Sequence, residues 1–135
     1  MFVGNLIPTA SLMKNRFTYL IPLLILLIMG TQASAQRKIL VFGKQDQPAL
    51  VDEQLKILDK AAAGVKERDL QVTVVGSADP LGKKFKVKPG QFTVLLIGKD
   101  GGEKHRSNQP VSAAEFFAMI DAMPMRQQEM RSKDQ

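Results

Sequence analysis

The chain contains no cysteine, no tryptophan and one histidine among its 135 residues. Without a thiol it forms no disulfide, and it cannot act as a thiol reductase, isomerase or peroxidase. The single histidine, His105, has neither a second histidine nor a thiolate beside it, so we expect an ordinary strand residue rather than a zinc ligand or part of a nucleophilic relay. Asp52 and Glu53 are neighbours in a predicted helix and point in different directions, unlike two catalytic carboxylates. We therefore predict no metal, no cofactor and no catalytic residue.

The sequence lacks a hydrophobic run long enough to span a membrane, and its longest hydrophobic run is Phe17–Met29. That run is shorter than the roughly 20 residues of a spanning helix, and Pro22 interrupts it. Two basic residues precede it and Ala33-Ser34-Ala35 follow it, which is the three-part pattern of a secretory signal. We predict a signal peptide over residues 1–35 and an exported domain that is periplasmic or extracellular. An uncleaved membrane anchor is the alternative, and Met1 and Met13 both stay open as the start.

A strongly basic character is also missing. Residues 1–35 carry two basic and no acidic residues, so their removal lowers the net charge from +6 to +4. This mild excess favours anionic surfaces but falls short of the concentrated basic face of a nucleic-acid-binding protein. We expect no nucleic-acid partner and no stable membrane span after cleavage.

The remaining residues are enough for one small domain with one core. Continuous apolar runs predict three buried strands, and an Asp-Gly turn predicts a fourth strand paired with the third in a hairpin. These strands are expected at Lys38–Gly43, Leu70–Gly76, Gln91–Gly98 and Lys104–Ser107.

Two amphipathic helices are predicted. Apolar residues recur at helical spacing from Ala49 to Ala63, and Gly64 is expected to end that helix in a left-handed conformation. The capping box Ser112-Ala-Ala-Glu115 begins the second helix, which Pro124 ends. A short helical turn is expected within 79–85, and residues 126–135 are predicted to be a polar C-terminal tail with a frayed helical turn.

The predicted order is strand, helix, strand, helical turn, strand, strand, helix. The first helix can link two parallel strands through a right-handed crossover. We therefore predict an α/β fold over residues 36–125: a single thioredoxin-like domain with a central mixed sheet of about four strands flanked by helices.

Five short segments of the sequence give independent support for this fold. They are Arg37–Phe42, Glu67–Asp69, Gly98–Gly102, Asp121–Arg126 and Glu129–Met130. Together they resemble an uncharacterised family of small exported bacterial proteins that is itself similar to the DUDES domain, a thioredoxin-like domain. The resemblance covers the whole chain after residue 35 and implies a fold but no activity.

The chain departs from thioredoxins proper at both catalytic hallmarks. Lys44–Ala49 follows the first strand where a thioredoxin carries its two cysteines, and Phe92 precedes Thr93 where thioredoxins place a cis-proline. The resemblance therefore implies a thioredoxin-like scaffold that lacks the redox centre.

Three charged residues in the family-like segments are candidate ligand or partner contacts, because charge at these positions is not needed for packing. They are Lys99 and Asp100 in the hairpin turn and Arg126 near the C-terminus. For Arg126 the alternative is a structural one, in which its guanidinium binds carboxylates or carbonyls and clamps the tail onto the domain.

A basic patch is the other candidate binding feature. It comprises Lys83, Lys84, Lys86 and Lys88. Phe85 and Val87 alternate with these lysines, which favours apolar anchors in the core and lysines turned outward. The patch either contacts an anionic ligand, polymer or membrane surface, or is a solvated face that maintains solubility.

Methionines are concentrated near the C-terminus, at Met119, Met123, Met125 and Met130. Thioethers suit cuprous copper, but flexible methionine is also a common filler of core gaps. Because Pro124 separates Met125 from the helix that carries Met119 and Met123, we expect packing rather than a copper site.

We predict an exported, non-catalytic binding or interaction module without thiol redox activity. Its partner is an unidentified envelope or extracellular protein or an anionic ligand. The alternative is a non-thiol enzyme with a site built from lysine, arginine and aspartate. That alternative calls for a concave pocket that contains Asp46, Lys99 or Arg126.

Overall fold

A computed structural model of the protein describes Gly4 and residues 35–135. Apart from Gly4 and Ala35, the predicted signal peptide lies outside the described residues. Residues Ala35–Gln135 form one compact unit.

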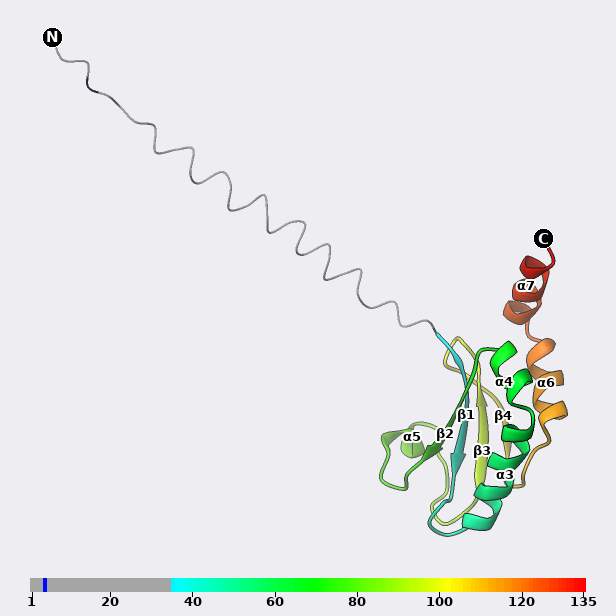
Figure 1. The fold of residues 1–135 in the computed structure, drawn as a ribbon. Coiled ribbons are helices and arrows are strands. Elements are labelled where there is room, and N and C mark those ends of the chain that lie inside the picture. The colour runs from blue at the N-terminus through cyan, green and yellow to red at the C-terminus, as the bar shows by residue number, and fades with distance from the viewer. Residues whose placement is uncertain (1–3, 5–34) are drawn as a thin grey trace. The chain divides into compact units, whose positions relative to one another are not determined.

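Four strands form one mixed sheet in the order β2-β1-β3-β4 (Figure 1). They are β1 (Arg37–Phe42), β2 (Leu70–Val75), β3 (Thr93–Ile97) and β4 (Glu103–Ser107). β1 and β2 run parallel, with Ile39 opposite Val72, whereas β3 is antiparallel to both β1 and β4. The predicted mixed sheet of about four strands is confirmed.

The helices divide between the two faces of the sheet. They are α3 (Pro48–Lys60), α4 (Ala62–Glu67), α5 (Pro80–Lys84), α6 (Ala113–Asp121) and α7 (Pro124–Lys133). Figure 1 shows α3, α4 and α6 on one side of the sheet and the short α5 on the other. Two parallel strands cannot be joined by a tight turn and need a long crossover connection. Helices α3 and α4 provide this connection between β1 and β2.

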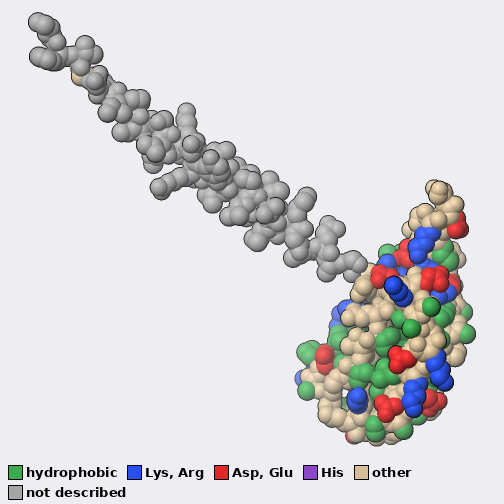
Figure 2. Space-filling view, viewed as in Figure 1, with side chains coloured by type: hydrophobic (Ala, Val, Ile, Leu, Met, Phe, Trp, Pro, Cys, Tyr) green, Lys and Arg blue, Asp and Glu red, His purple; other side chains and the backbone are tan. Residues whose placement is uncertain are grey.

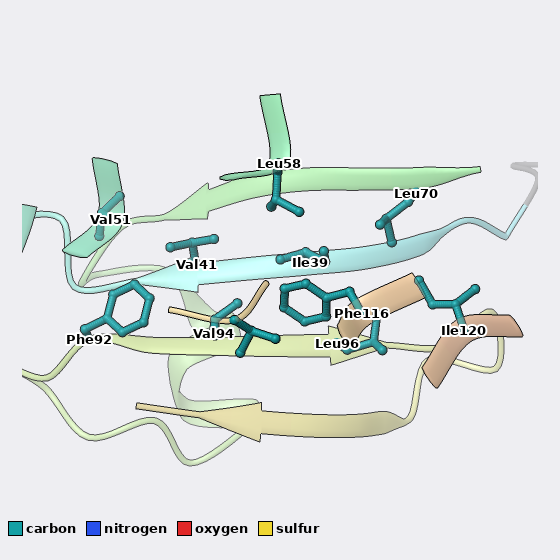
Figure 3. Packing of buried hydrophobic residues seen from close by; sticks show 11 residues of the cluster. Ile39, Val41, Val51, Leu58, Leu70, Phe92, Val94, Leu96, Phe116 and Ile120 are labelled. Atoms are coloured by element: carbon teal, nitrogen blue, oxygen red, sulfur yellow. The ribbon is translucent and has the colours of Figure 1, made fainter. Parts of the chain in front are cut away.

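Alternation along the strands divides the buried residues into two cores. The larger core contains Ile39, Leu58, Leu96, Phe116 and Ile120 among others, and Figure 3 shows Phe116 between Ile39 of β1 and Leu96 of β3. The smaller core lies on the α5 side of the sheet. It contains Leu40, Phe42, Val75, Leu95 and Ile97, with Leu81, Phe85 and Val87 packed against them.

The predicted start of α6 is confirmed, because the Ser112 hydroxyl accepts a hydrogen bond from the Glu115 amide at 3.2 Å. The predicted left-handed stop at Gly64 is wrong. Gly64 lies inside α4 and is not among the glycines with positive φ. A Cβ at Gly64 would lie 2.5 Å from Cε2 of Phe117, so the glycine allows α6 to approach α4.

The C-terminal segment differs from the expected frayed turn. Residues Pro124–Lys133 form the ten-residue helix α7, in which Pro124 occupies the first turn and Arg126 is buried. Proline suits that position because its missing amide would have no partner there. Within residue 4 and residues 35–135, no helix is both long and apolar enough to cross a membrane.

Candidate functional site

A cleft of about 500 Å³ opens where the parallel strands β1 and β2 end. In open α/β sheets, ligands bind outside the carboxyl ends of the strands. The volume is in the range of pockets that hold small organic molecules. We call it the lysine cleft. Its lining residues include Phe42–Asp46, Val75–Asp79, Gly82, Lys83 and Lys86–Gln91.

The cleft is shaped by a close approach between the end of β1 and the segment that precedes β3. Gly43 has a φ of +104°, and a Cβ there would lie 2.8 Å from the carbonyl oxygen of Gln91. Only glycine tolerates both the positive φ and this close backbone approach without displacing the backbone. The residue after β1 thus fixes the position of the Lys44–Asp46 turn beside the cleft.

The opposite wall of the cleft comes from α5. The Asp79 carboxylate accepts a hydrogen bond from the Leu81 amide at 2.9 Å and so caps this short helix. The helix ends in a Schellman motif, in which the Val87 amide donates to the Gly82 carbonyl at 2.9 Å and the Lys86 amide donates to the Lys83 carbonyl at 3.2 Å. Lys86 takes the left-handed conformation in this motif, with a φ of +53°.

The charge of the lysine cleft is predominantly positive. Four lysines line it, Lys44, Lys83, Lys86 and Lys88, against the two carboxylates of Asp46 and Asp79. Three of the four lysines of the predicted basic patch therefore face one concavity. Lys84 does not line the cleft, and its Nζ lies 5.3 Å from the centre of the Phe85 ring.

The functional groups of the cleft are suited to holding a ligand. No histidine is among the residues that line it. Ser77 Oγ donates to the Gln45 side-chain oxygen at 3.0 Å, so the hydroxyl is bound to an amide rather than to a base. Asp46 is exposed at the cleft and matches one of the three residues named for the enzyme alternative. Among the described residues no group of three histidines or carboxylates is placed to hold a metal ion.

The candidates Lys99 and Arg126 lie at the opposite end of the sheet, in a cluster that we call the ionic clamp. It consists of Arg37, Glu67, Arg68, Asp69, Lys99, Asp121, Arg126 and Glu129. Figure 2 shows basic and acidic side chains against one another at the end of the domain from which α7 projects. The clamp joins β1, α4, the β3–β4 turn, α6 and α7.

Arg126 is at the centre of the ionic clamp, and its side chain is only 2% exposed. It donates to the Glu67 carboxylate at 3.0 Å and to the Asp121 carboxylate at 3.3 Å. It also donates to the Glu67 backbone carbonyl at 3.3 Å. These contacts match the structural alternative for Arg126, in which it clamps the C-terminal segment.

Glu129 of α7 joins Lys99 to the same cluster. Arg37 donates to both carboxylate oxygens of Glu129, at 3.1 and 3.2 Å, and Lys99 Nζ lies 2.8 Å from Glu129 Oε1. Burial raises the pKa of Glu129, but the hydrogen bonds from Arg37 and Lys99 outweigh that effect and lower the pKa to about 2. The hydrogen bonds from Arg68 similarly hold the pKa of Asp121 below its usual value.

The third candidate, Asp100, lies outside the clamp. Its carboxylate binds Lys104 Nζ at 2.7 Å and the Gly102 amide at 3.0 Å, and the bond from Lys104 lowers its pKa. These contacts stabilise the β3–β4 turn, in which Gly101 has the expected positive φ of +79°. Lys99 and Arg126 are thus brought together, whereas Asp100 is not.

A second cavity, of about 630 Å³, borders the ionic clamp. Met119, Met123 and Met125 line it together with Lys99 and Asp100, so we call it the methionine groove. Although Pro124 separates Met125 from the helix that carries Met119 and Met123, all three methionines share this surface. His105 lies away from both cavities, with its ring edge-on to Phe116 at 6.5 Å between centroids.

Sequence reasoning missed several residues of both sites. Lys44 belongs to the same basic concavity as Lys86, although 42 positions separate them in the sequence. Arg37 and Arg68 bind the clamp carboxylates but resemble solvated surface charges in the sequence. The available signal was that Arg37 begins a family-like segment, and that Arg68 lies in another between two acidic residues, Glu67 and Asp69.

Comparison with known proteins agrees with the fold. Residues 29–129 match the family profile described as Domain of unknown function (DUF4174). The reduced 2-Cys peroxiredoxin of Plasmodium vivax is similar, with a TM-score of 0.54 and 16% identity over 69% of this chain and 80% of that chain. Thioredoxin-2, described as a component of malaria parasite protein secretion machinery, aligns with a TM-score of 0.49 and 20% identity over 71% of this chain and 91% of that one. No curated protein gives a significant match. The peroxiredoxin match shows a shared fold and nothing of activity.

Proposed function

We propose that this chain, which belongs to the DUF4174 family, is an exported, non-catalytic binding module that holds an anionic ligand in the lysine cleft. The observation that carries the proposal is the convergence of four lysines on one concavity at the carboxyl ends of β1 and β2. Lysine side chains attract anions over several ångströms, and a concave wall concentrates their field.

The chemistry of the first loop supports binding rather than redox work. In thioredoxins the loop after the first strand carries the two cysteines, and here the same loop contributes Lys44, Gln45 and Asp46 to the cleft. This loop therefore lines a concavity in a chain that contains no cysteine anywhere. A scaffold of this kind can lose one chemistry and keep a ligand site, because function depends on the site and not on the fold.

Export is supported by the pattern of residues 1–35. Mass spectrometry of the protein recovered from the periplasm or the medium tests this part of the proposal. We expect a mature N-terminus at Gln36. An intact N-terminus on protein that fractionates with membranes would instead support the uncleaved anchor.

Ligand capture from envelope extracts tests the binding role. The lysine-cleft variant carries Lys44→Glu and Lys88→Glu, and the control carries Lys56→Glu and Lys60→Glu on the exposed face of α3. The net charge of the two variants is the same. We expect acidic material on the wild type and on the control but not on the cleft variant. Equal recovery from all three proteins would overturn the proposal.

The competing function is a non-thiol enzyme, and the position of Asp46 in the cleft favours it. Incubation of the captured material with the protein distinguishes the two functions. A binding module returns the ligand chemically intact. Conversion of the ligand by the wild type, and its loss in Asp46→Asn, would establish the enzyme instead.

A further inference from the structure

We infer that the ligand of the lysine cleft is a small organic anion with an apolar body, and that Lys86 contacts its acidic head group. This inference rests on the proposed function and adds the class of ligand and the residue that selects it. Three features of the cleft support the inference: its apolar lining, its size and the backbone conformation of Lys86.

The floor of the lysine cleft belongs to the smaller hydrophobic core. Phe42 and Val75 lie beneath the cleft and are only 5% and 3% exposed. The accessible apolar surface of the cleft therefore comes mainly from the half-buried Val87 and the exposed Ala78 and Pro89. These side chains offer no hydrogen bonds, so an inorganic anion on this floor would lose hydration without compensation. An apolar body on the floor and an acidic group at the lysines match both parts of the lining.

The size of the cleft favours one small molecule over a polymer. A volume of about 500 Å³ suits a single ligand of ordinary metabolite size. An acidic polymer needs a continuous basic track, whereas the lysines of the cleft share its wall with two carboxylates, those of Asp46 and Asp79. Lys84, the remaining lysine of the patch, does not line the cleft.

The backbone of Lys86 indicates that this lysine is present for its side chain. Position 86 is the left-handed residue of the Schellman motif that ends α5, with a φ of +53°. Glycine is the usual residue there, because a Cβ is disfavoured in that conformation. Strained backbone of this kind is concentrated at functional sites. In Lys86 the strained position coincides with a cationic side chain on the wall of the cleft.

Calorimetric titration with a matched series of small molecules tests the inference. Octanoate supplies an acidic head and an apolar body, acetate the head alone, and 1-octanol the body alone. We expect octanoate to bind at least about tenfold more tightly than acetate, because each buried methylene adds roughly fourfold in affinity, and more tightly than 1-octanol because of the lysines.

Substitutions at Lys86 and Lys84 locate the contact. Lys86→Gly is expected to weaken octanoate binding about fivefold and to raise the melting temperature, because it relieves the strained backbone. Lys86→Ala is expected to weaken binding equally without raising the melting temperature. Lys84→Ala removes the same charge outside the cleft and is expected to leave the affinity unchanged.

The outcomes separate this inference from the proposed function. If inorganic phosphate or polyglutamate binds in a Lys44-dependent manner and octanoate does not, the cleft is an anion site and the ligand class inferred here is wrong. If octanoate binds equally well to Lys86→Gly, the role of Lys86 is wrong. If none of these anions binds, both the inference and the proposed function fail.

Discussion

Arg126 has two possible roles, a ligand contact or a structural clamp, and the two roles predict different effects of its removal on stability. A ligand contact can be removed with little effect on stability, whereas a buried clamp cannot. Arg126 is almost fully buried and is surrounded by carboxylates of Glu67, Asp121 and Glu129. Its removal would leave these groups without their common partner.

We therefore expect Arg126→Ala to lower the free energy of unfolding by about 2 kcal/mol, because a buried guanidinium loses its charge-assisted hydrogen bonds to partly exposed carboxylates. Thermal and urea denaturation measure the change. Arg131→Ala, at an exposed position of the same helix, serves as the control and is expected to change stability by less than about 0.5 kcal/mol. An unchanged melting temperature in Arg126→Ala would argue against the clamp.

Gly64 and Gly82 make a second contrast between single residues, because both are glycines inside helices. Gly64→Ala places a methyl group against the Phe117 ring, which also stacks against Arg68 at 4.2 Å. We expect this overpacking to cost about 1–2 kcal/mol even though alanine favours helix.

At Gly82 the added Cβ would lie 3.9 Å from Cε1 of Phe42, an ordinary contact. Gly82→Ala is therefore expected to stabilise the protein by about 0.5–1 kcal/mol in the same denaturation experiment. Destabilisation at Gly82 or stabilisation at Gly64 would show that the contacts of these helices are assigned incorrectly.

Two single residues, Ser112 and Gly64, show what local sequence signals can and cannot predict. The capping role of Ser112 was predictable, because its partner Glu115 is three residues away. The role of Gly64 was not, because its partner Phe117 lies more than 50 residues further along the chain. A glycine that ends a helix and a glycine that allows close packing are identical in sequence until the packing partner is known.

Among the elements, α7 is held by charge rather than by an apolar face. Arg126 is its buried residue, and Glu129 binds Arg37 and Lys99. Most stable helices in proteins dock an amphipathic face. The sequence of α7 has no continuous apolar face, which is why most of it was expected to be a tail and why its docking depends on partners elsewhere in the chain.

We expect Glu129→Gln to release α7 while the sheet stays intact. Hydrogen exchange at pH 7 would then show fast exchange at the amides of α7 and unchanged protection in β1 and β3. Glu103→Gln, which removes a surface partner of Arg106, is the control and should leave α7 protected. Equal protection of α7 in wild type and Glu129→Gln would contradict its dependence on the clamp.

For the whole molecule, the ionic clamp predicts a definite dependence of stability on pH. The folded state holds the pKa of Glu129 near 2, whereas an unfolded chain protonates this carboxyl near 4.5. Below pH 4.5 the unfolded state therefore binds more protons, and the free energy of unfolding decreases as pH falls toward 2. Glu129 contributes up to roughly 3 kcal/mol to this decrease.

Denaturation in urea between pH 6 and pH 2 measures this effect. We expect wild-type stability to be nearly constant above pH 5 and to decline steadily below pH 4.5. Glu129→Gln should start lower and decline less steeply, with the remaining slope coming partly from Asp121, whose pKa is also lowered. Parallel curves for the two proteins would contradict a role for Glu129 in acid sensitivity.

At this scale the sequence was a good guide to the fold and a partial guide to the site. Apolar periodicity and the Asp-Gly turn were enough to predict the mixed sheet, because strands and helices are defined by neighbours in sequence. The lysine cleft was predictable only as a basic patch, since Lys44 and Lys86 meet through the topology of the sheet. The clamp around Arg126 likewise joins five elements.

We propose the lysine cleft as the binding site of this domain. Titration of the ¹⁵N-labelled protein with octanoate, followed through its amide chemical shifts, tests this assignment residue by residue. We expect saturable shifts at Gly43, Gly76, Lys86 and Gly90, all of which line the cleft. Shifts confined to the methionine groove, or no saturable shift with octanoate and none with inorganic phosphate in a parallel titration, would contradict the assignment.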